Sequence, residues 1–216
     1  MEKRFFTVSS HRNSLVTIQA AEGHFATGSS HISHYIDISE LKSSASIAKE
    51  AARELAIPYL TNTIVDVIVY MEGTEIIAAY LADDLLNSGG IGVMNADDEI
   101  HVVTPMSGAG GHFIFHENVQ KKIMNKNILL FVATMSTGAT INRAVECLTY
   151  YGGKLVGISA IFSAVSEIDG WKIHSLFTRE DIPGYKFYRP FECEICKSGN
   201  KLDAIINSEG YTKIEN

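Results

Sequence analysis

A short polar stretch between two apolar segments is the part of this sequence best suited to chemistry. Ile128–Ala133 (ILLFVA) predicts a buried strand, and Ala139–Tyr151 has the periodicity of a helix. The junction gathers backbone N–H groups, hydroxyls and the positive end of a helix dipole, which suits a phosphate monoester. The same residue types are also ordinary in helix capping. The candidate phosphate-binding residues are Ser136, Thr137, Gly138, Ala139 and Thr140.

Cysteines and histidines offer metal ligands, but not in a strong ligand spacing. Cys193 and Cys196 form a C-x-x-C pair, which is half of a tetrahedral zinc site, and the residues that could complete it are Cys147 and His174. Without a second close pair, two structural thiols in a tail are the favoured interpretation, so no metal is predicted. Turn or surface positions are expected for the remaining candidates, which are His24, His31, His34, His112 and His116.

Length and composition predict one folded domain over residues 1–216. The chain has 46% hydrophobic and 20% charged residues, enough for a substantial core. Its apolar runs are shorter than a bilayer helix, and the first residues lack the apolar core of a signal peptide. Three cysteines fit a reducing compartment. We therefore expect a cytoplasmic protein without membrane association.

The charge of the chain is negative and unevenly distributed. The formal net charge is −7, which argues against a nucleic-acid surface. From Glu54 to Gln120, 67 residues contain no Lys or Arg but ten Asp and Glu. A phosphate bound to that segment would find no side-chain cation within it.

The remaining pattern predicts an α/β protein with a mostly parallel sheet. Helices are expected at Ser44–Leu55 and Glu75–Leu86, and a hairpin or flap at 107–116. The expected strands are Ile64–Tyr70, Ile91–Asn95, His101–Thr104, Lys154–Phe162 and, at an edge, Trp171–Phe177.

Four stretches together resemble one enzyme family. Ile128–Thr140 resembles the phosphoribosyl-pyrophosphate loop of the type I phosphoribosyltransferases. Gly23–Ile38 is similar to the N-terminal segment of the orotate phosphoribosyltransferases, and Asp66–Ala79 to their pyrophosphate-loop strand, turn and helix. Cys193–Gly199 is similar to a CPLC-type ending of some members. The first three stretches occur in the family's order and spacing, and the resemblance covers nearly the whole chain.

The resemblance implies a fold and a reaction. The fold is a type I phosphoribosyltransferase-like α/β domain. Its central, mostly parallel sheet is flanked by helices and carries a flap, with a small hood from residues 1–40 and a tail from residue 190. The family transfers ribose 5-phosphate from phosphoribosyl pyrophosphate to a base nitrogen with Mg²⁺. By analogy, the chain is expected to be a homodimer in pyrimidine metabolism, with the 5′-phosphate bound by residues 136–140.

Three parts of the family's site are not matched. The acidic pair that binds the ribose hydroxyls and organises the metal falls at Val132 and Ala133, which supply no ligand. The flap, roughly Asn95–His116, contains no Lys or Arg. The pyrophosphate turn, G-P-A-x-G-G in the family, reads here Tyr70, Met71, Glu72, Gly73, Thr74 and Glu75.

The two acids of that turn, Glu72 and Glu75, would repel a pyrophosphate unless a cation intervened. They could replace the lost pair as metal ligands, although a solvated turn and a helix N-terminal charge are the more ordinary interpretation. No catalytic residue is assigned.

Three functions therefore stay open. The favoured one is a protein that binds a 5′-phosphorylated ribose compound, with transferase activity weak or lost. The second is an active phosphoribosyltransferase of pyrimidine metabolism that uses Mg²⁺. The third is a scaffold subunit that binds no ligand.

Overall fold

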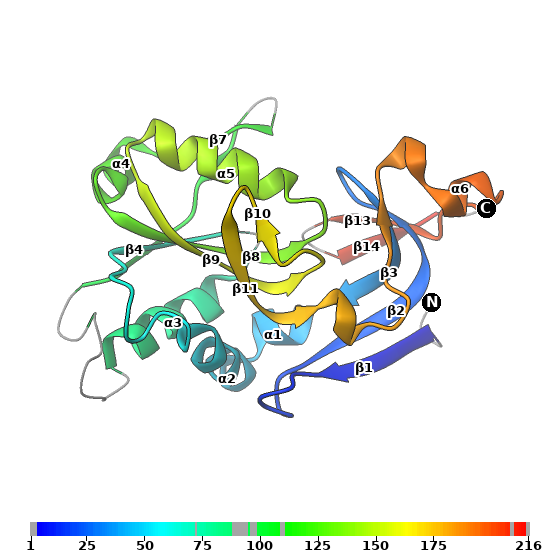
Figure 1. Ribbon diagram of the computed structural model, residues 1–216, viewed down its shortest axis with the longest axis horizontal. Coiled ribbons are helices and arrows are strands. Elements are labelled where there is room, and N and C mark those ends of the chain that lie inside the picture. The colour runs from blue at the N-terminus through cyan, green and yellow to red at the C-terminus, as the bar shows by residue number, and fades with distance from the viewer. Residues whose placement is uncertain are drawn as a thin grey trace.

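Two six-stranded sheets and one short hairpin account for the strands of the described residues (Figure 1). The computed structural model describes residues 4–71, 73–87, 95, 99–108, 111–207 and 210–214. The central sheet has the order β10-β11-β9-β8-β4-β5. The second sheet, called the hood sheet here, has the order β12-β3-β2-β13-β14, with β1 paired to β2.

The central sheet is parallel except at one edge. Strands β11, β9, β8, β4 and β5 pair in parallel, and only the two-residue β10 pairs antiparallel, with β11. The expected parallel α/β sheet is thus confirmed. Its strands are β4 (Val67–Tyr70), β5 (His101–Val103), β8 (Asn127–Met135), β9 (Lys154–Ser163), β10 (Glu167–Ile168) and β11 (Trp171–Thr178).

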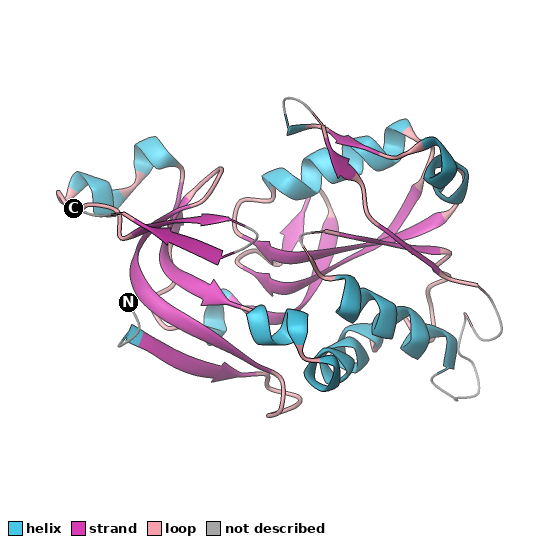
Figure 2. Ribbon diagram, turned by 180° about the vertical axis from the view of Figure 1, so that it is seen from behind, coloured by secondary structure: helices cyan, strands magenta, loops and turns pink. Residues whose placement is uncertain are grey.

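Alternate residues of β8 enter two different apolar cores. Leu129 and Phe131 pack with the residues of α2 (Ala45–Ala56) and α3 (Glu75–Asn87). Leu130 packs with α4 (Glu117–Ile123) and α5 (Ala139–Tyr150) on the opposite face. Figure 2 shows these helices on both faces of the sheet. Burial on both faces explains why this strand is continuously apolar.

The predicted helices are confirmed within one or two residues, since α2 begins after its N-cap Ser44 and α3 begins at Glu75. The predicted flap is an antiparallel hairpin of β6 (Met106–Ser107) and β7 (Phe113–Ile114). Strand boundaries differ more. The expected strand Ile91–Asn95 lies outside the described residues, apart from Asn95.

Two strand ends differ from expectation for identifiable reasons. The strand expected from Ile64 begins only at Val67, because the Val65 N–H bonds the Asn95 side chain instead of a neighbouring strand. The strand expected to end at Ala133 continues to Met135, because β9 keeps pairing with it as far as Ser163. The polar loop before α5 is correspondingly shorter.

The hood sheet combines both ends of the chain. Its N-terminal strands are β1 (Phe5–Ser9), β2 (Thr17–Ala26) and β3 (His31–Asp37). Its C-terminal strands are β12 (Phe187–Tyr188), β13 (Ala204–Asn207) and β14 (Gly210–Lys213). The tail from residue 190 therefore supplies two of these strands, β13 and β14. Between β12 and β13 lie the short helices η4 (Pro190–Glu192) and α6 (Glu194–Lys197).

Among the described residues, no helix is both long and apolar enough to cross a bilayer.

We predict that Leu129→Ala lowers the free energy of unfolding by about 2–5 kcal/mol, because it leaves a cavity at a fully buried position in the middle of β8. Urea denaturation followed by circular dichroism measures the change. The matched control is Leu15→Ala, at a leucine that is 67% exposed, which should change stability by less than about 0.5 kcal/mol. Equal effects of the two substitutions would contradict this assignment of the core.

Candidate ligand-binding site

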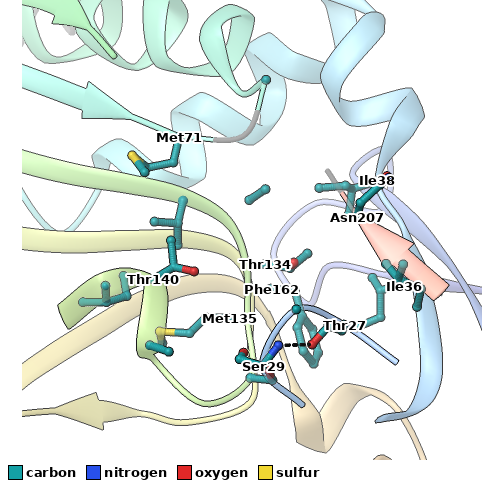
Figure 3. A pocket seen from close by; sticks show the side chains of 18 of the residues that line it. Thr27, Ser29, Ile36, Ile38, Met71, Thr134, Met135, Thr140, Phe162 and Asn207 are labelled. Carbon is teal, nitrogen blue, oxygen red and sulfur yellow. Dashed lines mark hydrogen bonds between the residues drawn. The ribbon is translucent and has the colours of Figure 1, made fainter. Parts of the chain in front are cut away.

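A cavity of about 1360 Å³ lies between the hood sheet and the carboxyl ends of the central strands. Ligands of open parallel sheets bind at this end of the strands. Figure 3 shows Thr27, Ile36 and Ile38 of the hood on one side of the cavity and Met71, Met135 and Thr140 on the other. All five predicted phosphate-binding residues, Ser136, Thr137, Gly138, Ala139 and Thr140, line this cavity.

The loop between β8 and α5, residues 136–140, is called the cradle here. Gly138 is the N-cap residue of α5 and has a left-handed backbone with φ of 78°. Because the N-cap residue is a glycine, it offers no side chain that could cap this helix. The first N–H groups of a helix have no intrahelical acceptor, so those of α5 are donors at the cavity wall. This is the arrangement that binds a phosphate at a helix N-terminus.

Gly138 is required by space as well as by backbone conformation. A Cβ atom there would lie 2.0 Å from Cδ1 of Ile168, which packs over the turn from β10. A left-handed φ also disfavours any side chain at this position. The cradle therefore depends on a glycine at 138.

The tip of the hood touches the cradle directly. Oγ of Ser30 lies 3.0 Å from Oγ of Ser136, and Oγ of Ser29 lies 3.5 Å from Oγ1 of Thr137. Ser30 is fully buried, and its N–H donates to Oγ1 of Thr27 across the tight turn between β2 and β3. The β2–β3 turn is thus part of the site. The resemblance of Gly23–Ile38 to the family's N-terminal segment did not indicate that this turn meets the cradle.

Val132 and Ala133, the expected acid-pair positions, line the cavity near the end of β8. Both are nearly fully buried, with Val132 in the core under α5 and Ala133 in the core under α2 and α3. Neither side chain can accept a hydrogen bond or bind a cation. The wall of the cavity is therefore apolar at these two positions, while the next residue along β8, Thr134, brings a hydroxyl to the same wall.

The expected pyrophosphate turn follows β4, and all of it except Glu72 lies within the described residues. The Met71 N–H donates to the Phe131 carbonyl, and the buried Thr74 hydroxyl donates to the Met71 carbonyl. Gly73 has a φ of 70° and Glu75 begins α3. Met71, Gly73 and Glu75 line the cavity. Burial, and secondarily the charge of Glu75, raises the pKa of Tyr70 at the end of β4.

Two positively charged side chains line the cavity, and both come from outside residues 54–120, the segment without Lys or Arg. Lys42 of α1 (Ser39–Ser43) lies against the turn after β4, with Nζ 3.1 Å from the point where a Cβ of Gly73 would stand. Arg143 of α5 donates from Nη1 to the Gly111 carbonyl of the flap, at 3.1 Å. Both line the cavity. Sequence reasoning missed them because it looked for cations within residues 54–120, whereas the fold brings them from flanking helices.

The described acids that line the cavity are Asp37 and Glu75. Asp37 accepts the Ser39 N–H at the start of α1. Burial, then the charges of Asp37 and Tyr211, raises the pKa of Tyr35 to about 12, so its phenol is neutral at physiological pH. The cavity therefore carries charges of both signs, with its cations near the turn after β4 and near the flap.

The overall geometry can be compared with known structures. An adenine phosphoribosyltransferase from Thermoanaerobacter pseudethanolicus is similar with a TM-score of 0.50 and 14% identity, over 82% of this chain and 96% of that chain. The chain has the fold of the type I phosphoribosyltransferases. This confirms the expected fold class, with its flap and hood.

Further structures with this fold were found. An orotate phosphoribosyltransferase from Aeropyrum pernix has a TM-score of 0.49 and 19% identity, over 74% of this chain and 88% of that chain. A phosphoribosyltransferase from Corynebacterium diphtheriae has a TM-score of 0.48 and 21% identity, over 69% and 85%. No family model and no curated protein matches the sequence of this phosphoribosyltransferase-fold chain.

The expected metal candidates do not gather at the cavity. Cys147 of α5 donates to the Phe113 carbonyl, and His174 of β11 packs against Tyr59. His34 is buried in the hood sheet beside Ser33, and burial lowers its pKa. His112 and His116 are exposed near the flap. The expectation that Cys147 or His174 would complete a metal site with the C-x-x-C pair was wrong. The pair lies instead against His24 and His31 in the hood.

We predict that Gly138→Ala is more costly than Gly170→Ala, although both glycines have a left-handed φ near 80°. A Cβ at Gly170 meets nothing within 4 Å, so its cost is the backbone strain of about 1–2 kcal/mol. At Gly138 the contact with Ile168 should add about 1–3 kcal/mol. Urea denaturation measures both. Addition of Ile168→Ala should recover part of the Gly138→Ala loss, and no recovery would contradict the proposed contact.

Proposed function

We propose that this protein binds a small molecule with a 5′-phosphorylated ribose, either a nucleotide or phosphoribosyl pyrophosphate, at residues 136–140. The single observation that carries the proposal is the cradle, in which the uncapped N-terminus of α5 and its flanking hydroxyls face a cavity at the carboxyl end of β8. A phosphate accepts from such amides and is favoured by the helix dipole. The ribose and base would extend into the space between the hood and the central sheet.

We further propose that orotate transferase activity is weak or lost. Removing one preorganised electrostatic group from an active site costs about 10²–10³ in rate. Here the acid pair is replaced by two buried apolar side chains, Val132 and Ala133, and the flap sequence contains no Lys or Arg. These losses need not multiply, but together they oppose ordinary turnover.

The side chains present do not fit the family's magnesium site. Mg²⁺ prefers carboxylate, phosphate and water oxygens, and neither Val132 nor Ala133 offers one. Glu75 is the described carboxylate in the turn after β4, and it lies near the side chain of Lys42. We therefore assign no metal-dependent step.

An active phosphoribosyltransferase is the second candidate, favoured by one observation. Lys42 and Arg143 place two positive charges at the cavity, near the turn after β4 and near the flap. They could partly compensate for the missing flap cations by attracting a diphosphate. A homodimer and a cytoplasmic location remain proposals by analogy with the family.

The deciding experiment is isothermal titration of the full chain with uridine monophosphate, orotidine monophosphate and phosphoribosyl pyrophosphate, each with and without Mg²⁺. The proposal expects binding of a monophosphate without Mg²⁺ and no turnover of orotate. Tight Mg²⁺-dependent binding of phosphoribosyl pyrophosphate with orotate turnover would establish the active transferase instead. No binding of any of the three would leave a scaffold role.

We predict that Thr140→Val weakens binding of uridine monophosphate by about 10-fold or more, because a hydrogen bond to a charged phosphate contributes about 1.5–3 kcal/mol. The matched control is Thr149→Val, at the other end of the same helix, where the hydroxyl donates to the Val145 carbonyl. The control should leave the affinity unchanged. Equal affinities of the two variants would place the phosphate elsewhere.

We predict that Lys42→Gln and Arg143→Gln each weaken binding of phosphoribosyl pyrophosphate by about two- to fivefold, the range of a solvent-accessible ion pair of up to about 1 kcal/mol. The effect should shrink as salt is added, because these charges are screened. Lys49→Gln is the control, since Lys49 packs over the ring of Tyr80 instead of lining the cavity. Titration calorimetry at two salt concentrations measures the difference. An equal loss in the control would show only a long-range charge effect.

A further inference from the structure

Four potential metal ligands converge on the hood sheet, outside the cavity. They come from two segments far apart in sequence: His24 and His31 from the β2–β3 hairpin, and Cys193 and Cys196 from the tail. One ligand atom from each of the four lies within 4.8 Å of every other. His24 and Cys193 are buried, His31 is partly buried and Cys196 is exposed.

The topology of the hood sheet explains why these residues meet. Tyr188 of β12 pairs with His31 on the β3 edge, and Ala204 of β13 pairs with Phe25 on the β2 side. The chain between them must therefore cross the β2–β3 pair, and it does so with η4 and α6. Cys193 lies between these two helices, and Cys196 lies within α6. A register shift between Glu22 and Phe25 also interrupts the regular pairing of β2 at His24.

The distances fit a tetrahedral zinc ion. With Zn–N near 2.0–2.1 Å and Zn–S near 2.3 Å, ligand atoms should be about 3.3 Å apart for two nitrogens and about 3.6 Å for nitrogen and sulfur. Nε2 of His24 lies 3.2 Å from Nδ1 of His31. Nε2 of His24 also lies 3.4 Å from Sγ of Cys193 and 3.5 Å from Sγ of Cys196, and Nδ1 of His31 lies 3.3 Å from Sγ of Cys196.

Hydrogen bonds to the outer side of His24 hold it in the orientation of a ligand. Nδ1 of His24 lies 3.1 Å from the Asn200 carbonyl and 3.2 Å from the Lys201 carbonyl. A carbonyl only accepts, so the proton is on Nδ1 and the lone pair of Nε2 faces the two sulfurs. Metal-bound histidines commonly have such a backbone partner. The Asp203 carboxylate and N–H also bind the His24 backbone, at 2.8 and 2.7 Å.

We propose that His24, His31, Cys193 and Cys196 bind one zinc ion that fixes the tail onto the hood sheet. Two thiolates and two imidazoles are a donor set that suits zinc among the common divalent ions. Four protein ligands fill a tetrahedral site and leave no position for a substrate, so the zinc is structural. It joins residues 169 positions apart in the chain, His24 and Cys193.

The site also borders the cradle through one residue. His31 follows Ser30, whose hydroxyl lies against Ser136. The zinc therefore holds the turn end of the same hairpin whose tip forms part of the ligand cavity. This role does not depend on which ligand the cavity takes.

The test begins with the full chain purified under reducing conditions without added metal. Inductively coupled plasma mass spectrometry should find about one zinc ion per chain. After chelation, Co²⁺ should restore a tetrahedral visible spectrum with a thiolate-to-cobalt charge-transfer band. Cys196→Ser and His31→Asn should lose most of the bound zinc. The matched controls, Cys147→Ser and His112→Asn, should keep it.

Chelation of the wild-type chain should lower its melting temperature and open the tail after Tyr188 to limited proteolysis. The proposal is overturned if the reduced chain holds no zinc and gives no Co²⁺ spectrum, for example because the cysteines pair as a disulfide. It is also overturned if Cys196→Ser and His31→Asn both keep a full complement of zinc. Thr140→Val should leave the zinc content unchanged, so failure of the ligand proposal and failure of the zinc proposal are distinguishable.

Discussion

The contact of Ser30 with Ser136 joins the two sheets of this molecule at the edge of the cavity. Ser30 is fully buried, and its hydroxyl lies within hydrogen-bond distance of both Thr27 and Ser136. This small polar junction joins the hood turn to the cradle, while the space beyond it stays open as the cavity. A ligand phosphate at the cradle would meet hydroxyls that are already positioned by each other, which lowers the cost of ordering them on binding.

The lining of the cavity is polar, apolar or positively charged in different regions, so each region suits a different part of a ligand. The cradle offers amides and hydroxyls, and the adjoining strand end is apolar at Val132 and Ala133. The cations lie near the turn after β4 (Lys42) and between the cradle and the flap (Arg143). Such a site is suited to the proposed binding of a phosphate, although Val132 and Ala133 supply no group that would stabilise an oxocarbenium-like transition state. Binding and catalysis depend on different residues in this fold, so one can persist without the other.

The sequence predicted those parts of the fold that depend on local pattern. Local patterns predicted β8 from its apolar run, α2 and α5 from their helical spacing, and the cradle loop from its small residues. Each prediction was correct within a few residues. The parts it missed depend on distant pairing. Lys42 reaches the cavity only because α1 lies beside the turn after β4, and His24 approaches Cys193 only because the tail crosses the hood hairpin. Neither of these contacts produces a short-range pattern in the sequence that could predict it.

The hood sheet is built from both ends of the chain, and this has a consequence for synthesis on the ribosome. Residues 67–178 contain all six strands of the central sheet, so this sheet can form before β12, β13 and β14 are synthesised. Until then, the edges of the β2–β3 hairpin that β12 and β13 cover in the finished structure are unpaired. The topology thus allows the central sheet to form before the hood sheet, and the uncovered edges of the β2–β3 hairpin are where a chaperone would bind a nascent chain.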